Sequence, residues 1–359
     1  MQELMDSKRR YKEIDMAKGI GIICIVASHV YPGILFNQIL FSFHVPLFFL
    51  ISGFTYRYYD NKKAFYGNKS RRILIPYLFF SIISILLLWV MNIVLPLNAD
   101  TRILPNIAGM FFANSNSFNM TWNSPLWFLP CMFVSLVLMD FLESMLRRSQ
   151  RENCIVCRSV VIISLWTAGI FVNTQRSIYL PLHAETALFL TGFTELGYVL
   201  SKYIIRDNAG DNNGVLKRNM FPQIVCLFVI LGTTASCING WTDVRTHIFG
   251  KIPVLLIVSS VCFSFAVLIG TVIIKRCQWL EFLGIHSMAI LVMHKFPVMF
   301  CKMLIPGAQE VLNNSGNLFG FFVGLIVTAC SIAACLVCER VILSLFPYSL
   351  GVAFKRRNS

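Results

Sequence analysis

The chain has 359 residues, of which 56% are hydrophobic and only 13% are charged, and its mean hydropathy is +0.68. Soluble globular proteins carry roughly 25% charged residues, so this composition excludes an ordinary water-soluble protein. Runs free of Asp, Glu, Lys and Arg cover residues 73–99, 219–242, 252–274 and 311–338. Each run exceeds the about 20 residues that a helix needs to cross the hydrocarbon core. The lipid bilayer is therefore the first partner that the sequence implies.

These apolar runs are predicted to be helical, because every backbone polar group in lipid must be paired within the structure. The predicted fold is all-α, a polytopic membrane protein built as a bundle of about ten transmembrane helices. In chain order the helices are expected at residues 17–36, 42–58, 73–96, 126–142, 158–174, 184–204, 221–239, 252–274, 279–303 and 317–346. Pro32, Gly33 and Pro46 interrupt the first long run, which predicts a tight helical hairpin there.

The distribution of Lys and Arg predicts the orientation, because these residues are retained on the cytoplasmic side of a membrane. With both termini in the cytoplasm, most of the 31 Lys and Arg residues fall in inner segments. This accounts for the net charge of +14 without nucleic acid, which is not expected as a partner. We expect a cytoplasmic segment at 1–16, one transmembrane domain at 17–346 and a basic cytoplasmic tail at 347–359.

Cysteines give no sign of a metal centre. Cys154 and Cys157 lie close together in a predicted inner loop. A structural zinc site needs four ligands, commonly from a second such pair or from nearby histidines. Neither accompanies this pair, so no metal is expected.

Two ionisable residues share one face of the first predicted helix. Lys18 and His29 are eleven residues apart, and at about 100° per residue this separation is three turns plus about 20°. The rise between them is about 16 Å, so a lysine at the inner boundary places the histidine near the middle of the bilayer. A cation at the mouth and an imidazole deeper along one stripe suit a ligand with an anionic head and a reactive tail, such as acetyl-CoA.

The segment YKEIDMAKGIGIICIVASH at residues 11–29 resembles the opening of the acyltransferase 3 family of membrane proteins, in which a basic residue precedes a histidine at this spacing. The resemblance continues through FHVPLFFLISGF at 43–54, RILIPY at 72–77, PLWFLPCMF at 125–133 and LEFLGIHSMAILVMH at 280–294. It spans nearly the whole chain. Within the family, the sequence is most similar to the fucose 4-O-acetylase type.

The resemblance implies an acyltransferase that moves an acetyl group from acetyl-CoA to a hydroxyl of a sugar or cell-surface polysaccharide. It also implies a ten-helix bundle with a cofactor route from the cytoplasm. We therefore expect acetyl-CoA as the donor, a glycan as the acceptor, and the bacterial cytoplasmic membrane as the location.

We expect His29, Lys18 and His44 to take part in catalysis. A neutral imidazole has a near-neutral pKa suited to a general base, and His29 would take the proton of the acceptor hydroxyl. Lys18, Arg71 and Arg72 at the inner boundary would pair with CoA phosphates. For the two arginines, retention on the inner side is an equally good explanation. His44 would orient the acceptor, hydrogen-bond to His29, or have only a structural role in the helical hairpin.

Three further residues are candidates for contact with the acceptor. Trp127 would stack on a sugar, although aromatic side chains also anchor helices at the membrane interface. Glu195 stands in TGFTELGYVL at 191–200, where the family pattern would be apolar; it would contact the acceptor, pair with a histidine or be protonated. His294 matches the terminal histidine of the family and would be structural or face the acceptor.

A proton-coupled secondary transporter of a small polar solute or polysaccharide precursor is the alternative, since membrane-embedded Glu and His also form proton relays. Transporters often show paired internal repeats, and the sequence shows none. The glycerolipid acyltransferases, with His and Asp separated by four residues, are not matched at any histidine of the chain.

Overall fold

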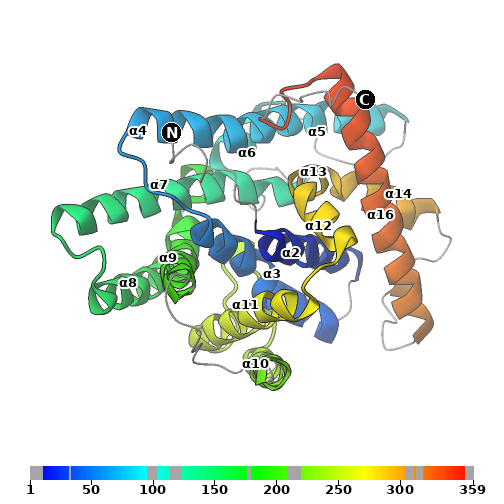
Figure 1. Cartoon of the computed structure of the whole chain (residues 1–359). Coiled ribbons are helices and arrows are strands. Elements are labelled where there is room, and N and C mark those ends of the chain that lie inside the picture. The colour runs from blue at the N-terminus through cyan, green and yellow to red at the C-terminus, as the bar shows by residue number, and fades with distance from the viewer. Residues whose placement is uncertain are drawn as a thin grey trace.

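The computed structural model describes residues 11–31, 34–94, 103–113, 123–175, 179–207, 220–304, 311–312 and 318–351. Over these residues the fold is a helical bundle, which confirms the predicted all-α class (Figure 1). The long elements are α2 (Lys12–Val30), α3 (Ile34–Phe54), α5 (Ile75–Val94), α7 (Phe128–Arg148), α8 (Ile155–Thr174), α9 (Ala184–Asp207), α10 (Phe221–Asn239), α11 (Pro253–Ile274) and α16 (Leu318–Leu345). The short elements are α4 (Lys62–Lys69), η1 (Ser70–Leu74), α6 (Ile103–Phe112), η2 (Ser124–Trp127), η3 (Pro181–His183), η5 (Val244–Thr246), α12 (Gln278–Ile285), α13 (Ser287–Met293) and α14 (Lys295–Leu304).

Within the described residues, seven helices are long and apolar enough to cross a membrane, or eight if the bent pair α13–α14 forms one span. The predicted number of about ten also counted α2 and α9. Both are long enough to cross, with 19 and 24 residues, but they carry charged side chains that lower their hydropathy. Asp15 on α2 and Glu195 on α9 are buried inside the protein, which is where a membrane helix tolerates a charge.

The helix α2 lies at the centre of the bundle and packs against α3, α11, α12, α13 and α16 (Figure 1). At its contact with α12 the two helix backbones approach closely. A Cβ atom on Gly19 of α2 would collide with the backbone carbonyl of Leu280, and one on Gly284 of α12 would collide with that of Asp15. Small residues permit such approach between membrane helices, where packing rather than hydrophobic burial drives association.

A second close contact joins α3 and α9 through a reciprocal pair of glycines. A Cβ atom on Gly53 would meet the backbone carbonyl of Thr194, and one on Gly197 would meet that of Leu50. The two carbonyls belong to rigid helical backbone, so neither can move aside cheaply. This contact fixes the position of α9 beside the central hairpin.

The second predicted helix differs from the structure at its start. The sequence predicts a start at residue 42, and it places Pro46 among the residues that interrupt the first long apolar run. In the structure α3 begins at Ile34 and continues through Pro46. Proline has no N–H to donate to the carbonyl four residues earlier, which here belongs to Ser42. The hydroxyl of Ser260 on α11 donates to that carbonyl at 2.5 Å. The freed acceptor is thus satisfied from a neighbouring helix, as the apolar surroundings require. Pro32 and Gly33 lie outside the described residues.

The single helix predicted at 279–303 is divided into α12, α13 and α14, and the axis bends by 58° between α13 and α14. Pro297, in the first turn of α14, cannot donate a hydrogen bond to the carbonyl of Met293, and its ring disfavours a straight helix there. The bend falls at His294 and turns the chain back toward α2. The predicted continuous span is therefore wrong at this point.

The reciprocal glycine contact provides a test of the packing. We expect Gly197→Ala to lower the thermal melting midpoint in detergent by several degrees, because overpacking of a rigid contact costs about 1–3 kcal/mol. The measurement is size-exclusion chromatography with fluorescence detection after a temperature series. Gly270→Ala is the matched control, since a Cβ atom there meets nothing within 4 Å. Equal midpoints for the two variants would contradict the close approach of α3 and α9.

Candidate active site

A cavity of about 350 Å³ lies between α2, α3, η1, α7 and the α12–α13 segment. Three basic side chains line it, Lys18, Lys69 and Arg72, together with Asp15, whose carboxylate lies 3.5 Å from the Lys18 ammonium. The deeper wall is apolar and aromatic and includes Phe48 and Phe128. We call this space the basic cavity. It can hold an anionic group at one end and an uncharged chain behind it.

Arg71 and Arg72, both predicted to meet the cofactor, are placed differently. They lie in η1, a π-helical turn that continues α4 into α5, and only Arg72 lines the basic cavity. The backbone of both arginines packs beside Gly351. Lys69 lines the cavity although the sequence did not single it out. The sequence feature that could have indicated Lys69 is its spacing of three residues from Arg72, which places the two side chains on adjacent turns.

A second, smaller cavity of about 30 Å³ is lined by His29, His44 and Trp127, three predicted site residues from α2, α3 and η2. Asp243 and Arg245, from the segment between α10 and α11, complete its wall. We call this space the histidine cavity. The sequence missed Asp243 and Arg245, because they stand in the short charged connection between two apolar runs, where charged residues are expected to face water.

His294 also reaches this region, because the bend between α13 and α14 brings its ring centroid to 5.1 Å from that of His29. The end of α2 is held there by Lys302, whose ammonium donates to the carbonyl of His29 at 3.0 Å. Carbonyls in the last turn of a helix have no partner of their own, so a lysine is favourable in this place.

Hydrogen bonds to backbone carbonyls define the proton positions of two of the histidines. His44 Nδ1 lies 2.5 Å from the carbonyl oxygen of Leu40, and His294 Nδ1 lies 2.9 Å from that of Leu291. A carbonyl only accepts, so Nδ1 carries the proton in each ring. In the neutral imidazoles Nε2 is therefore the unprotonated acceptor. Both rings thus offer a proton-accepting atom in this part of the protein.

Neighbouring residues of α3 and of the start of α7 line the two cavities. Trp127 lines the histidine cavity and the next residue, Phe128, lines the basic cavity. On α3, Val45 lines the former and Phe48 the latter. The rings of Phe48 and Phe128 pack edge to face, with centroids 5.8 Å apart. The α2 helix bears Lys18 on one cavity and His29 on the other, about 16 Å apart along its axis.

Glu195 is not brought to the histidines. It belongs to a buried ion-pair cluster in which the Arg158 guanidinium bonds both Glu195 and Glu143, the latter at 2.6 Å. The Tyr198 hydroxyl donates to Glu143 at 3.0 Å. The cluster connects α7, α8 and α9, and neither cavity includes Glu195 in its lining. Its predicted contact with the acceptor remains a prediction, and its observed partner is an arginine.

Comparison with known proteins gives one match. The profile of the acyltransferase domain family, acyltransferase 3, matches residues 11–337. This range contains every segment that carried the resemblance in the sequence, together with both cavities. Neither a curated protein nor a solved structure matches the chain. Because the profile covers most of the chain, the protein belongs to the acyltransferase 3 family and is a membrane acyltransferase.

Proposed function

We propose that the protein transfers an acetyl group from acetyl-CoA to a hydroxyl of a sugar or cell-surface polysaccharide, with His29 as the general base. The observation that carries the proposal is the placement of Lys18 and His29 at two adjoining cavities along one helix. Coenzyme A has phosphates at one end and its thioester at the other, joined by a long uncharged arm. The basic, apolar and imidazole side chains of α2 and α3 follow one another in the same order as the phosphates, the arm and the thioester of coenzyme A.

In this proposal the phosphates bind Lys18, Lys69 and Arg72 in the basic cavity. Ammonium and guanidinium groups form charge-assisted hydrogen bonds to phosphate oxygens. The arm then passes Phe48 and Phe128, which line the apolar wall. We propose that the basic cavity faces the cytoplasm, where acetyl-CoA is made, and that both termini lie on the same side.

The reacting hydroxyl of the acceptor lies at the histidine cavity. The volume of this cavity, about 30 Å³, is too small for a whole sugar ring, so the cavity must widen when the acceptor binds. Trp127 offers a face for stacking, and Arg245 and Asp243 offer a donor and an acceptor for sugar hydroxyls. His29 takes the proton of the reacting hydroxyl as its oxygen attacks the thioester carbonyl. The C–O ester bond forms, the C–S bond breaks, and the proton passes to the departing CoA thiolate. His44 and His294 orient His29 and the acceptor through their Nε2 atoms.

We expect His29→Ala to reduce acceptor-dependent release of CoA by about 10²- to 10⁴-fold, the usual contribution of a general base. Release is measured with purified protein in nanodiscs supplied with acetyl-CoA and surface glycans. His286→Asn is the matched control: His286 Nδ1 lies 2.6 Å from Glu339, a contact that the amide can retain, and His286 lines neither cavity. Full activity of His29→Ala would remove this residue from the role of base.

We expect Arg72→Ala to raise the KM for acetyl-CoA about tenfold with little change in kcat, because loss of a phosphate contact of about 1.4 kcal/mol weakens binding of the donor. The neighbouring Arg71→Ala should change this KM much less, since Arg71 lies outside the lining of the basic cavity. Steady-state kinetics with varied acetyl-CoA distinguishes them. An equal effect of both changes would instead indicate a general attraction of the basic surface for the donor.

A further inference from the structure

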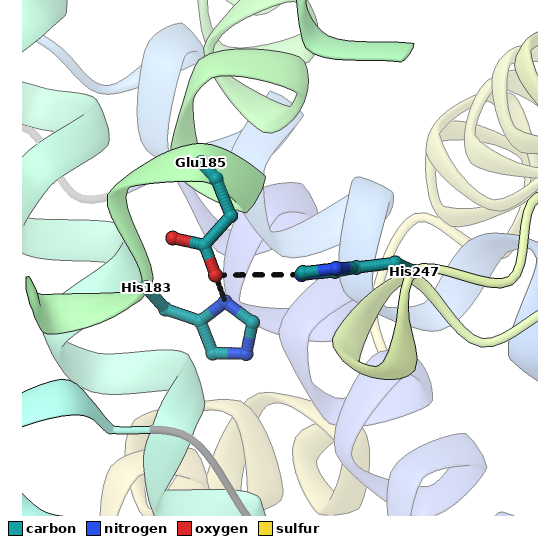
Figure 2. Close-up of side chains that lie close together, drawn as sticks. All are labelled: His183, Glu185 and His247. Atoms are coloured by element: carbon teal, nitrogen blue, oxygen red, sulfur yellow. Dashed lines mark ion pairs between the residues drawn. The ribbon is translucent and has the colours of Figure 1, made fainter. Parts of the chain in front are cut away.

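Two histidines and a glutamate converge beside the histidine cavity, and the proposed acetyl transfer uses none of them (Figure 2). His183 ends η3, Glu185 lies in the first turn of α9, and His247 follows η5 in the segment between α10 and α11. Glu185 Oε1 lies 3.0 Å from His183 Nδ1 and 3.3 Å from His247 Nε2. One donor atom from each residue lies within 4.8 Å of the other two.

The cluster is enclosed. The side chains of His183 and Glu185 are 0% exposed and that of His247 is 6% exposed. Within the described part of the chain, His183 Nδ1 and Nε2, Glu185 Oε1 and His247 Nε2 have no hydrogen bond of acceptable geometry. Polar atoms buried in this way are costly unless something pairs them. Glu185 Oε1 is within ion-pair distance of both imidazoles, so the three side chains already face one point, and a cation held there would pair the carboxylate and both rings at once.

The surrounding structure holds these side chains in place. The backbone N–H of Leu180 donates to Glu185 Oε2 at 3.0 Å, which leaves Oε1 directed at the two imidazoles. His183 and His247 both have left-handed backbone, with φ of 58° and 60°. Such φ values are uncommon for residues other than glycine, and strained backbone of this kind concentrates at functional sites. Two separate segments thus adopt unfavourable backbone to present the same type of side chain.

We propose that His183, Glu185 and His247 form a binding site for a divalent transition-metal ion, with Zn²⁺ as the best fit. Zn²⁺ favours His nitrogen and carboxylate oxygen at about 2.0–2.1 Å, which at tetrahedral angles separates neighbouring donor atoms by about 3.3 Å. The observed distances of 3.0 and 3.3 Å from Glu185 Oε1 agree with this value. The ligand atoms of the two histidines lie within 4.8 Å of each other, so the three side chains surround one point. The fourth position belongs to water or another oxygen donor.

The ion ties the segment between α10 and α11 to the start of α9. That segment also carries Asp243 and Arg245, which line the histidine cavity. On the other side, the ring of His183 lies 5.0 Å from that of Trp127, another lining residue. The metal therefore positions the wall of the acceptor cavity without entering the acyl transfer. The sequence predicted no metal from its cysteine spacing, and it gave no sign of this site because His247 is far along the chain from the other two residues.

The test is direct measurement of metal in the full-length protein in nanodiscs. The protein is stripped with a chelator, loaded with Zn²⁺ or Co²⁺, and desalted before elemental analysis and visible spectroscopy. We expect about one ion per chain, and with Co²⁺ the intense visible bands of a four-coordinate site with nitrogen and oxygen ligands. A wild-type protein that retains no Zn²⁺ after loading, and gives no such bands with Co²⁺, overturns the proposal. The three side chains then form only a hydrogen-bonded cluster around the carboxylate.

Substitutions of the proposed ligands test whether the ion binds at this site. His247→Ala and Glu185→Gln should each weaken metal retention by at least about tenfold, the scale on which even outer partners of a metal site act. His286→Asn changes another histidine that is paired with a glutamate, and it should retain the full metal content. Metal that stays bound in the His247→Ala, Glu185→Gln double variant lies elsewhere and overturns the assignment. Neither readout requires acetyl transfer, so loss of the proposed function would leave this result intact.

Discussion

The close approach of α2 and α12 is the constraint on which the arrangement of the site depends. Gly19 and Gly284 each lie against a backbone carbonyl of the opposite helix, so no side chain fits at either position. This contact holds α2 against the segment that carries α12, α13 and α14. At one end of α2 the basic cavity forms beside Gly284, and at the other end the bend in the same segment brings His294 to His29. The contact thereby holds Lys18 beside the α12 wall of the basic cavity and keeps α2 next to the segment that carries His294.

Apolar surroundings favour the pairing of every buried polar group in this bundle, and several of these pairs form between helices. The Ser42 carbonyl released by Pro46 is bonded by Ser260, and the His29 carbonyl is bonded by Lys302. The Arg158 cluster with Glu143 and Glu195 joins three helices by the same principle. Breaking one partner of such a buried pair is costly, because the other charge stays buried. Polar contacts here therefore orient helices as well as stabilise them.

The same preference gives meaning to the atoms that remain unsatisfied. Among the described residues these include His294 Nε2, beside His29, and the facing donor atoms of His183, Glu185 and His247. One set adjoins the cavity where we place the acceptor, and the other lies behind its wall. Ser81 Oγ and Trp166 Nε1 are likewise unpaired and line neither cavity, so only the convergence of several such atoms at His183, Glu185 and His247 points to a bound ion.

The sequence by itself determined the helical class, most helix positions and the family, and it named His29, His44 and Trp127 as separate candidates that the fold then places at one cavity. These follow from local features: apolar runs of membrane length, the eleven-residue spacing on α2, and short motifs. Only the tertiary structure decided that Arg72 and Lys69, rather than Arg71, line the basic cavity, and that Glu195 pairs with Arg158. It alone also brought His247 to His183 and Glu185. Local spacing determines which face of a helix a residue occupies, but contacts between distant segments depend on how the helices pack.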